Sequence, residues 1–331
     1  MEEKIKVTLD SNTYNILLKD CENFLFYKGE NDLNRNLFIN TLINNYYEEF
    51  SAIDDKFRLD VFSVIKNISE DEKEEVYHKL VKVIDKKNSS ADQGNKSVSF
   101  LFKPTKISSK AISFILNNFV KHESISSYFR RLFTSYAYKV QPEREKIIFK
   151  QNYALLCKSI DSNVKVYLSL SSGAVINEAS LYTISSSKDE LFNYALFVTE
   201  TGVLQTIRLA KIKDVILLTS KREILPQHEE IFNKQIKYGI QYSIKPYENE
   251  EIKVQLTPKG KELFKRIYLY RPQCSKIEGD IYYFSCSYAQ VEQYFRRFGE
   301  HAIVLSPNKI IRSLKNYYYF ANRAYNKIPV K

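Results

Sequence analysis

The sequence has no tryptophan, only eight glycines and only four cysteines, and each shortage excludes a class of protein. The cysteines, Cys21, Cys157, Cys274 and Cys286, are far apart and form no CxxC pair, which argues against a zinc site and against a disulfide framework. With so few glycines, no GxxxxGK or GxGxxG loop is present to hold the phosphates of a nucleotide. The four histidines show no metal or catalytic spacing. We therefore expect a protein that is not an enzyme and has no metal or cofactor.

Long apolar runs are also missing from the sequence. None approaches the ~20 consecutive apolar residues that a membrane span requires, and residues 1–10 lack the apolar core of a secretory signal. Scattered free cysteines are typical of a reducing compartment. The expected location is the cytoplasm.

Positive charge and aromatic side chains are abundant. Lys and Arg number 50 against 39 Asp and Glu, a net charge of +11, which favours an anionic partner, most often nucleic acid and less often a membrane surface. The 25 tyrosines and 21 phenylalanines can fill cores and can stack on nucleobases. A length of 331 residues indicates two or three domains, each with its own core.

A strand followed by two helices occurs twice in residues 1–142. Polar and apolar residues alternate at 4–9 and at 97–102, and apolar positions at helical spacing follow each strand. The apolar faces of the two second helices match at a spacing of 90 residues, which indicates an internal duplication. The matched positions are Ile39, Leu42, Ile43, Tyr46 and Tyr47 in the first copy and Phe129, Leu132, Phe133, Tyr136 and Ala137 in the second.

A helical insertion at about 51–96 separates the two copies. Apolar residues at 57, 61, 65 and 68 predict one helix. Ser69 and Glu72 form a capping box that opens another helix. The polar stretch 86–96, KKNSSADQGNK, is typical of a flexible loop.

The strand-helix-helix unit resembles the ribbon-helix-helix family, in which two copies pair their strands into an antiparallel ribbon that enters the DNA major groove. Two copies in one chain would form this pseudo-dimer internally. The resemblance implies that bases are read by the outward residues of the strands, which are Lys4, Lys6 and Thr8 in the first copy and Ser97, Ser99 and Leu101 in the second. It also implies a phosphate near 34–36 and near 124–126, at the N-termini of the second helices. The alternative is that these residues are ordinary N-caps.

Residues 143–224 are expected to form one helix, at 144–160, and a small β-barrel. Five short strands are predicted at 164–170, 174–184, 191–198, 203–210 and 212–219. So many short strands in under sixty residues favour a closed or nearly closed barrel over an open sheet.

This barrel resembles the WYL domain of bacterial regulators and CRISPR-associated proteins. The family's Trp-Tyr-Leu falls on Asn193, Tyr194 and Ala195, and its FRLDRI segment falls on 207–212, where Arg208, Leu209 and Ile212 match and Lys211 is a conservative replacement. The resemblance implies an Sm/SH3-like barrel that binds nucleic acid or a nucleotide-like ligand. Arginine and lysine would hold phosphate, and tyrosine would stack on a base. The candidate residues are Lys165, Tyr167, Tyr182, Tyr194, Arg208 and Lys211.

A structural alternative exists for the two cations of this segment. Charged residues on an edge strand protect it from pairing with another chain, so Arg208 and Lys211 are equally explained as solvated charges on a barrel edge. The sequence pattern leaves both interpretations open.

A helical linker at 225–250 leads to a last domain at 251–331. Strands are predicted at 251–257, 267–277, 280–287 and 301–305, with helices at 258–266 and 288–298 and a final helix at 308–325. The order strand, helix, strand, strand, helix, strand is ferredoxin-like. The segment FGEHAIVLSP resembles the C-terminal extension of WYL proteins, which implies a role in dimerisation and in nucleic-acid binding.

Basic residues and tyrosines interleave in this last domain, as single-stranded nucleic acid requires. The candidates for contacts with the phosphate backbone are Arg271, Arg296, Arg297 and Arg312. The run 317–320, YYYF, favours a packed dimer face instead.

The expected architecture is therefore a multidomain α+β protein with a tandem ribbon-helix-helix module, a WYL barrel and a ferredoxin-like extension. This layout resembles the WYL accessory proteins of type VI-D CRISPR systems, which implies a homodimer that binds single-stranded RNA and enhances an RNA-guided RNA nuclease. The alternative is a regulator that binds duplex DNA through the ribbon and senses a ligand through the barrel. A third hypothesis is an interaction scaffold that binds neither polymer.

Overall fold

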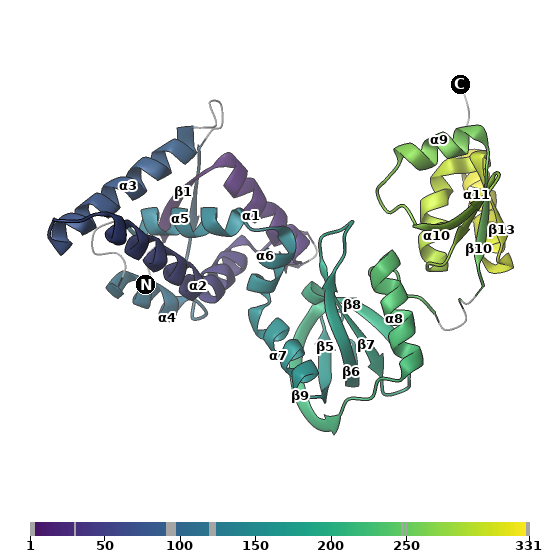
Figure 1. Ribbon diagram of the computed structural model, residues 1–331, viewed down its shortest axis with the longest axis horizontal. Helices are drawn as coiled ribbons and strands as arrows, with labels where there is room; N and C mark the ends of the chain where they lie inside the picture. The colour runs from purple at the N-terminus through teal and green to yellow at the C-terminus, as the bar shows by residue number, and fades with distance from the viewer. Residues whose placement is uncertain are drawn as a thin grey trace. The chain divides into compact units, whose positions relative to one another are not determined.

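A computed structural model gives the fold of the chain (Figure 1) and describes residues 4–29, 31–90, 97–118, 124–245, 248 and 250–328. Over these residues the protein is a mixed α+β structure with eleven α-helices and several small antiparallel sheets. The chain divides into two compact units, Met1–Lys150 and Gln151–Lys331. Across the described ranges, no helix combines the length and the apolarity that crossing a bilayer requires.

The first unit is built around a two-stranded antiparallel ribbon of β1 (Ile5–Asp10) and β4 (Ser97–Phe102). Helices α1 (Ser11–Asn23) and α2 (Arg35–Val64) follow β1, and α4 (Ser109–Asn118) and α5 (Ile125–Ala137) follow β4. A short hairpin, β2 (Tyr27–Lys28) with β3 (Asp32–Leu33), connects α1 to α2. One face of the ribbon is buried because alternate residues of a strand point to the same side.

The duplicated helical faces meet in the core of this unit. Leu42, Ile43 and Tyr46 of α2 have no exposed surface, and neither do their counterparts at 132, 133 and 136 of α5. The rings of Tyr46 and Tyr136, which occupy equivalent positions, contact each other edge to face with centroids 6.2 Å apart. Contact between equivalent residues is what a two-fold arrangement of the two copies requires.

A buried ion pair ties the first copy to the helix after the second, α6 (Gln141–Ile148). Arg144 of α6 donates from Nε to Oδ2 of Asp20 at 2.6 Å and from Nη2 to Oδ1 at 3.0 Å. The hydroxyl of Tyr136 donates to the same carboxylate at 2.9 Å. Burial, and next the charge of Asp20, raises the pKa of Tyr136 well above its ordinary value, so the hydroxyl stays a donor.

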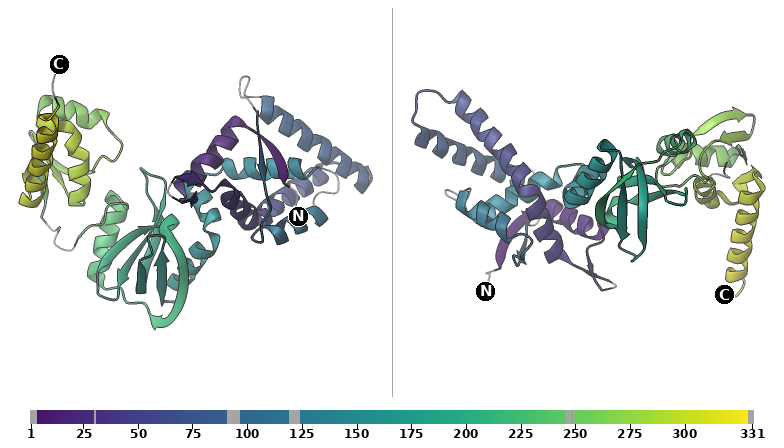
Figure 2. Two further views of the ribbon diagram at one scale, coloured as in Figure 1. Left: turned by 180° about the vertical axis from the view of Figure 1, so that it is seen from behind. Right: turned by 90° about the horizontal axis from the view of Figure 1, so that it is seen from below.

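The helical insertion differs from its prediction. No glycine or proline interrupts α2, which therefore continues unbroken to Val64. The helix predicted at 57–68 is the second half of α2, and it ends before the predicted boundary. The capping box of Ser69 and Glu72 is confirmed, with Glu72 N donating to Ser69 Oγ at 3.3 Å. It opens α3 (Glu70–Ser90), which lies beside α2 in Figure 2 and extends into the predicted loop. The lysines at 86 and 87 favour continuation of the helix into this stretch. The rest of the predicted loop, 91–96, lies outside the described residues.

The second unit begins with α7 (Lys150–Asp161) and a five-stranded antiparallel sheet in the order β8-β7-β6-β5-β9. Its strands are β5 (Val164–Leu170), β6 (Val175–Ser186), β7 (Asn193–Thr199), β8 (Leu204–Arg208) and β9 (Ile212–Lys221), followed by α8 (Pro226–Tyr238). Only the 3₁₀ turn Leu209–Lys211 joins the edge strands β8 and β9. The four residue steps from Arg208 to Ile212 reach at most about 15 Å. In a flat five-stranded sheet the two edge strands would lie about 19 Å apart. The sheet must therefore curl to bring β8 and β9 together.

Two boundaries in this region differ from the sequence expectation. The helix predicted at 144–160 is broken at Phe149, which has φ −103° and ψ 31° and packs its ring against Phe24 and Phe26. Tertiary packing of that ring overrides the local helical preference. The strand predicted at 203–210 ends at Arg208, where the 3₁₀ turn begins.

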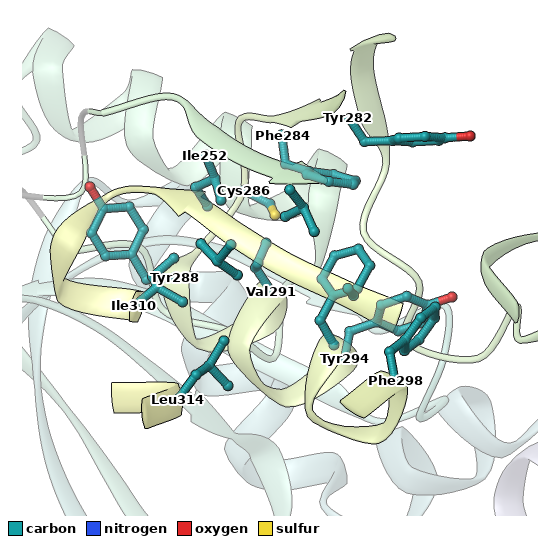
Figure 3. Close-up of a cluster of buried hydrophobic side chains, with 14 of the residues drawn as sticks. Ile252, Tyr282, Phe284, Cys286, Tyr288, Val291, Tyr294, Phe298, Ile310 and Leu314 are labelled. Carbon is teal, nitrogen blue, oxygen red and sulfur yellow. The ribbon is translucent and has the colours of Figure 1, made fainter. Parts of the chain in front are cut away.

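The C-terminal part of the second unit contains a four-stranded antiparallel sheet in the order β11-β12-β10-β13. The predicted order of elements is observed: β10 (Ile252–Leu256), α9 (Pro258–Arg266), β11 (Cys274–Glu278), β12 (Ile281–Phe284), α10 (Tyr288–Phe295), β13 (Ala302–Ser306) and α11 (Asn308–Tyr325). Figure 3 shows side chains from both layers, among them Phe284, Val291 and Leu314, filling the core between the sheet and its helices.

Two predicted elements of this domain are shorter than expected. The strand predicted at 267–277 forms only from Cys274 onward, because Tyr270 has a left-handed φ of 61° and Pro272 has no N–H for a ladder. The helix predicted at 288–298 ends at Phe295 and is followed by a 3₁₀ segment, Arg296–His301, that contains Gly299 at φ 56°.

Candidate nucleic-acid interface

A cleft of about 880 Å³ opens beside the end of β8 in the second unit. One wall comes from β8 and the turn after it, and an adjoining wall comes from the loop between β6 and β7. The lining residues include Arg208 and Lys211 from the first wall, Asp189, Glu190 and Phe192 from the second, and Tyr194, Gln241 and Tyr270. The cleft is large enough for a nucleotide and carries both signs of charge.

The basic wall is positioned by strand pairing. Tyr194 of β7 and Arg208 of β8 are Cα partners in the antiparallel register, so both side chains project to the same face of the sheet. The guanidinium of Arg208 lies over the ring of Phe192, 3.2 Å from its centroid, and this cation–π contact orients the fork of donors. Lys211 is exposed at the rim of the cleft. Together they supply the chemistry that holds a phosphate.

The acidic wall is held in place by Ser187, which is almost completely buried. Its hydroxyl accepts from the backbone N–H of Glu190 at 3.1 Å and donates to Oε1 of Gln241 at 3.0 Å. Gln241 in turn donates from Nε2 to Oδ2 of Asp189 at 3.2 Å, and the hydroxyl of Tyr194 donates to Glu190. Both carboxylates are therefore fixed before any ligand arrives.

The two carboxylates also act on the neighbouring Tyr270. Burial, then the charges of Glu190 and Asp189, raises the pKa of Tyr270, while Arg297 acts in the opposite direction. The phenol is therefore neutral at physiological pH. This coupling places Arg297, one of the predicted C-terminal arginines, within electrostatic reach of the cleft.

The cleft gathers three of the six residues expected from the WYL resemblance, Tyr194, Arg208 and Lys211. Lys165 instead forms ion pairs with Glu178 at 2.9 Å and with Glu223 at 3.6 Å. The other two tyrosines do not line the cleft. Tyr182 stacks on Phe232 of α8 and donates to Asn233, and Tyr167 pairs across the sheet with Ile216.

The outward face of the β1–β4 ribbon carries little charge. Lys6 is exposed and lies opposite Leu101, which is 59% exposed, while Thr8 and Ser99 share a hydrogen bond of 2.7 Å between their hydroxyls. Ser97 is exposed opposite Asp10, and Lys4 is exposed just before β1. The outward positions are Lys6 and Thr8 on β1 but Ser97, Ser99 and Leu101 on β4, so the two strands present different chemistry.

The predicted phosphate positions at the second helices are occupied by caps. The side chain of Asn34 accepts from Leu37 N at 3.2 Å, and that of Ser124 accepts from Ser127 N at 3.2 Å. Asn36 exchanges two hydrogen bonds with the backbone of Lys103. These contacts fit the N-cap alternative.

The four C-terminal arginines lie in different environments. Arg271 donates to the carbonyls of Phe264 and Lys265 at the end of α9, as a C-terminal helix cap. Arg296 pairs with Glu292 and lies over the ring of Tyr317, with the centroid at 4.5 Å. The remaining two are Arg297, whose guanidinium is 5.3 Å from the ring centroid of Tyr294, and Arg312, which is exposed on α11.

The positive charge of the protein is concentrated near its C-terminus. Residues 251–331 carry 15 Lys and Arg against 6 Asp and Glu, whereas residues 1–150 carry 24 against 22. Of the described part of α11, only Ile310 and Leu314 are buried, and its last turns lead away from the sheet in Figure 2. These turns expose aromatic rings among basic residues. The exposed rings include those of Tyr317, Tyr319, Phe320 and Tyr325.

Comparison with known proteins bears on the fold of the whole chain. No family model and no curated protein match the sequence. A solved structure described as "Crystal structure of a CRISPR Cas-related protein" is similar over 99% of this chain and 95% of that chain, with a TM-score of 0.68 and 18% identity. The two chains share a fold from end to end. A second structure, "Proteasome accessory factor B/C (PafBC) of Arthrobacter aurescens", covers 50% of this chain and 26% of that one at 10% identity, and its TM-score of 0.21 is too low to indicate a shared fold.

Sequence reasoning missed the acidic half of the cleft. Asp189 and Glu190 lie in the segment between two predicted strands, where acidic residues are common in turns. Gln241 and Tyr270 come from segments far along the chain, so no local pattern indicates them. Within the described ranges, no group of three or more His, Cys, Asp or Glu side chains is arranged to hold a metal ion.

Proposed function

We propose that this protein is a non-catalytic accessory protein of a type VI-D CRISPR system, which binds single-stranded RNA and enhances an RNA-guided RNA nuclease. The observation that carries the proposal is the end-to-end similarity to a CRISPR Cas-related protein, over 99% of this chain and 95% of the other. Similarity over nearly the full length of both chains involves the whole domain layout and not one common module.

The arrangement of each part supports the proposed layout. A ribbon of two strands, each followed by two helices, fits a ribbon-helix-helix pseudo-dimer. The curled five-stranded sheet after α7 fits a WYL barrel of the Sm type. The strand order β11-β12-β10-β13 with its two helices fits a ferredoxin-like extension.

The charge distribution supports single-stranded RNA over duplex DNA as the partner. Backbone-tracking cations beside stacking rings suit a single strand, and in this chain they occur in the second unit, at the cleft. The ribbon, which would read duplex DNA, offers an apolar Leu101 and hydroxyls at its centre. The exposed aromatic turns of α11 fit a homodimer face, and two copies would double the length of RNA that is held.

The test compares the affinity for a single-stranded RNA and for duplex DNA of the same sequence at 150 mM salt, because backbone attraction depends on salt. Tighter RNA binding, together with faster RNA cleavage when the protein is added to its nuclease, is the expected result. Tighter duplex binding that is lost in Lys6→Ala would instead establish the regulator. Negligible binding of both polymers would leave an interaction scaffold.

A further inference from the structure

The acidic wall of the cleft is unexpected in a site for RNA. Phosphates are repelled by Asp189 and Glu190, so the backbone of a bound strand must lie toward Arg208 and Lys211. What faces the carboxylates is then the base of the nucleotide. A carboxylate accepts hydrogen bonds only, so it selects bases by the donors that they present.

The donor pattern of the bases identifies guanine as the match. The Watson–Crick edge of guanine offers N1–H and the N2 amine side by side, which a carboxylate accepts as a pair. Adenine and cytosine place a ring acceptor beside their one amine, and uracil flanks its N3–H with two carbonyl oxygens. Recognition of an unstacked base on this edge is the usual way that proteins read single-stranded RNA.

Asp189 is the carboxylate best placed for this role. Its one described hydrogen bond comes from Gln241 to Oδ2, and an ionised carboxylate has about four acceptor sites. The chain Ser187, Gln241, Asp189 fixes its orientation without satisfying it. The half-buried ring of Tyr270 lines the same cleft and offers a stacking face.

We propose that this cleft selects guanine in single-stranded RNA, with Asp189 accepting from N1–H and the N2 amine while Arg208 and Lys211 hold the adjacent phosphate. The inference rests on the proposed function and adds a base preference to it. Asp189 acts as the specificity-determining residue, and the two cations contribute affinity that is independent of sequence.

The experiment measures the affinity of the full-length protein for three fluorescein-labelled RNA 12-mers at 150 mM salt. They are oligouridine, the same strand with one central guanosine, and the same strand with one central inosine, which lacks the N2 amine. The wild type should bind the guanosine strand about tenfold more tightly than oligouridine, the discrimination typical of a bidentate base contact, with inosine in between. Asp189→Asn should bind all three alike.

The matched control is Asp214→Asn, which makes the same chemical change on β9. Asp214 also accepts one side-chain hydrogen bond, from Ser169 at 2.8 Å, and does not line the cleft. It should keep the guanosine preference. Wild-type protein that binds all three strands equally well would refute the base preference and leave RNA binding intact, as would a preference that survives Asp189→Asn. Failure to bind any strand would overturn the proposed function itself.

Discussion

The buried ion pair of Asp20 and Arg144 should be among the largest single contributors to the stability of the first unit. Asp20 has no exposed surface and accepts three hydrogen bonds, two from Arg144 and one from Tyr136. Arg144→Met removes the guanidinium but keeps an apolar chain of similar length. The carboxylate then remains buried without its cation, which costs about 3–5 kcal/mol of unfolding free energy. For a unit of this size, that lowers the melting temperature by roughly 6–20 °C.

The assay is urea denaturation of the full chain, combined with hydrogen exchange of α1 and α5 to locate the effect in the first unit. The double variant Asp20→Asn with Arg144→Met should recover about 2 kcal/mol, because no charge is left buried. Lys146→Met is the control. It removes an exposed ion pair with Glu143, at 2.8 Å, and should change stability by about 0.5 kcal/mol or less. A loss below 1 kcal/mol in Arg144→Met, or a double variant as unstable as the single one, would refute the reasoning.

Three further predictions concern the second unit. Arg208→Ala with Lys211→Ala should weaken RNA binding several-fold and lower the slope of log affinity against log salt by about 2; an unchanged slope would assign phosphate binding to the C-terminal arginines. Burial raises the pKa of Cys286 to about 12, so its thiol should resist a thiolate-directed reagent at pH 8 until the protein unfolds. For the same reason, the stability of the protein should fall as pH rises from about 9 toward 12. Rapid labelling of the native protein would contradict this prediction. If the exposed rings of α11 form the proposed homodimer face, Tyr319→Ser with Phe320→Ser should give a monomer in light scattering, and an unchanged dimer mass would exclude this face.

The sequence predicts elements best where the periodicity is long and the ends are marked. The helix predicted at 308–325 is α11 (Asn308–Tyr325) without change, since it starts directly after Pro307 and keeps its apolar positions in register. Failures occur where tertiary contacts or backbone strain decide the outcome. Phe149 breaks a helix because its ring is needed in the core of the first unit, and the positive φ of Tyr270 ends a predicted strand.

For a similar reason, only the basic half of the candidate site could be predicted from the sequence. Tyr194 and Arg208 belong to neighbouring strands of a hairpin, and strand pairing brings such residues together from sequence alone. Asp189 and Gln241 are 52 positions apart and meet only because α8 and its following turn pack near the β6–β7 loop. No periodicity encodes a contact of that kind, so the acidic half of the cleft required the fold.

The two copies of the N-terminal module agree in their cores and differ on their outward faces. Equivalent positions such as Tyr46 and Tyr136 are both fully buried, whereas the outward ribbon positions hold Lys6 on β1 and only uncharged residues on β4. A ribbon that reads palindromic DNA needs the same residues in both halves, because the operator mirrors the symmetry of the protein. The positive charge excess lies instead in the second unit, which holds the cleft and α11. We therefore expect the nucleic-acid contacts of the proposed function in the second unit.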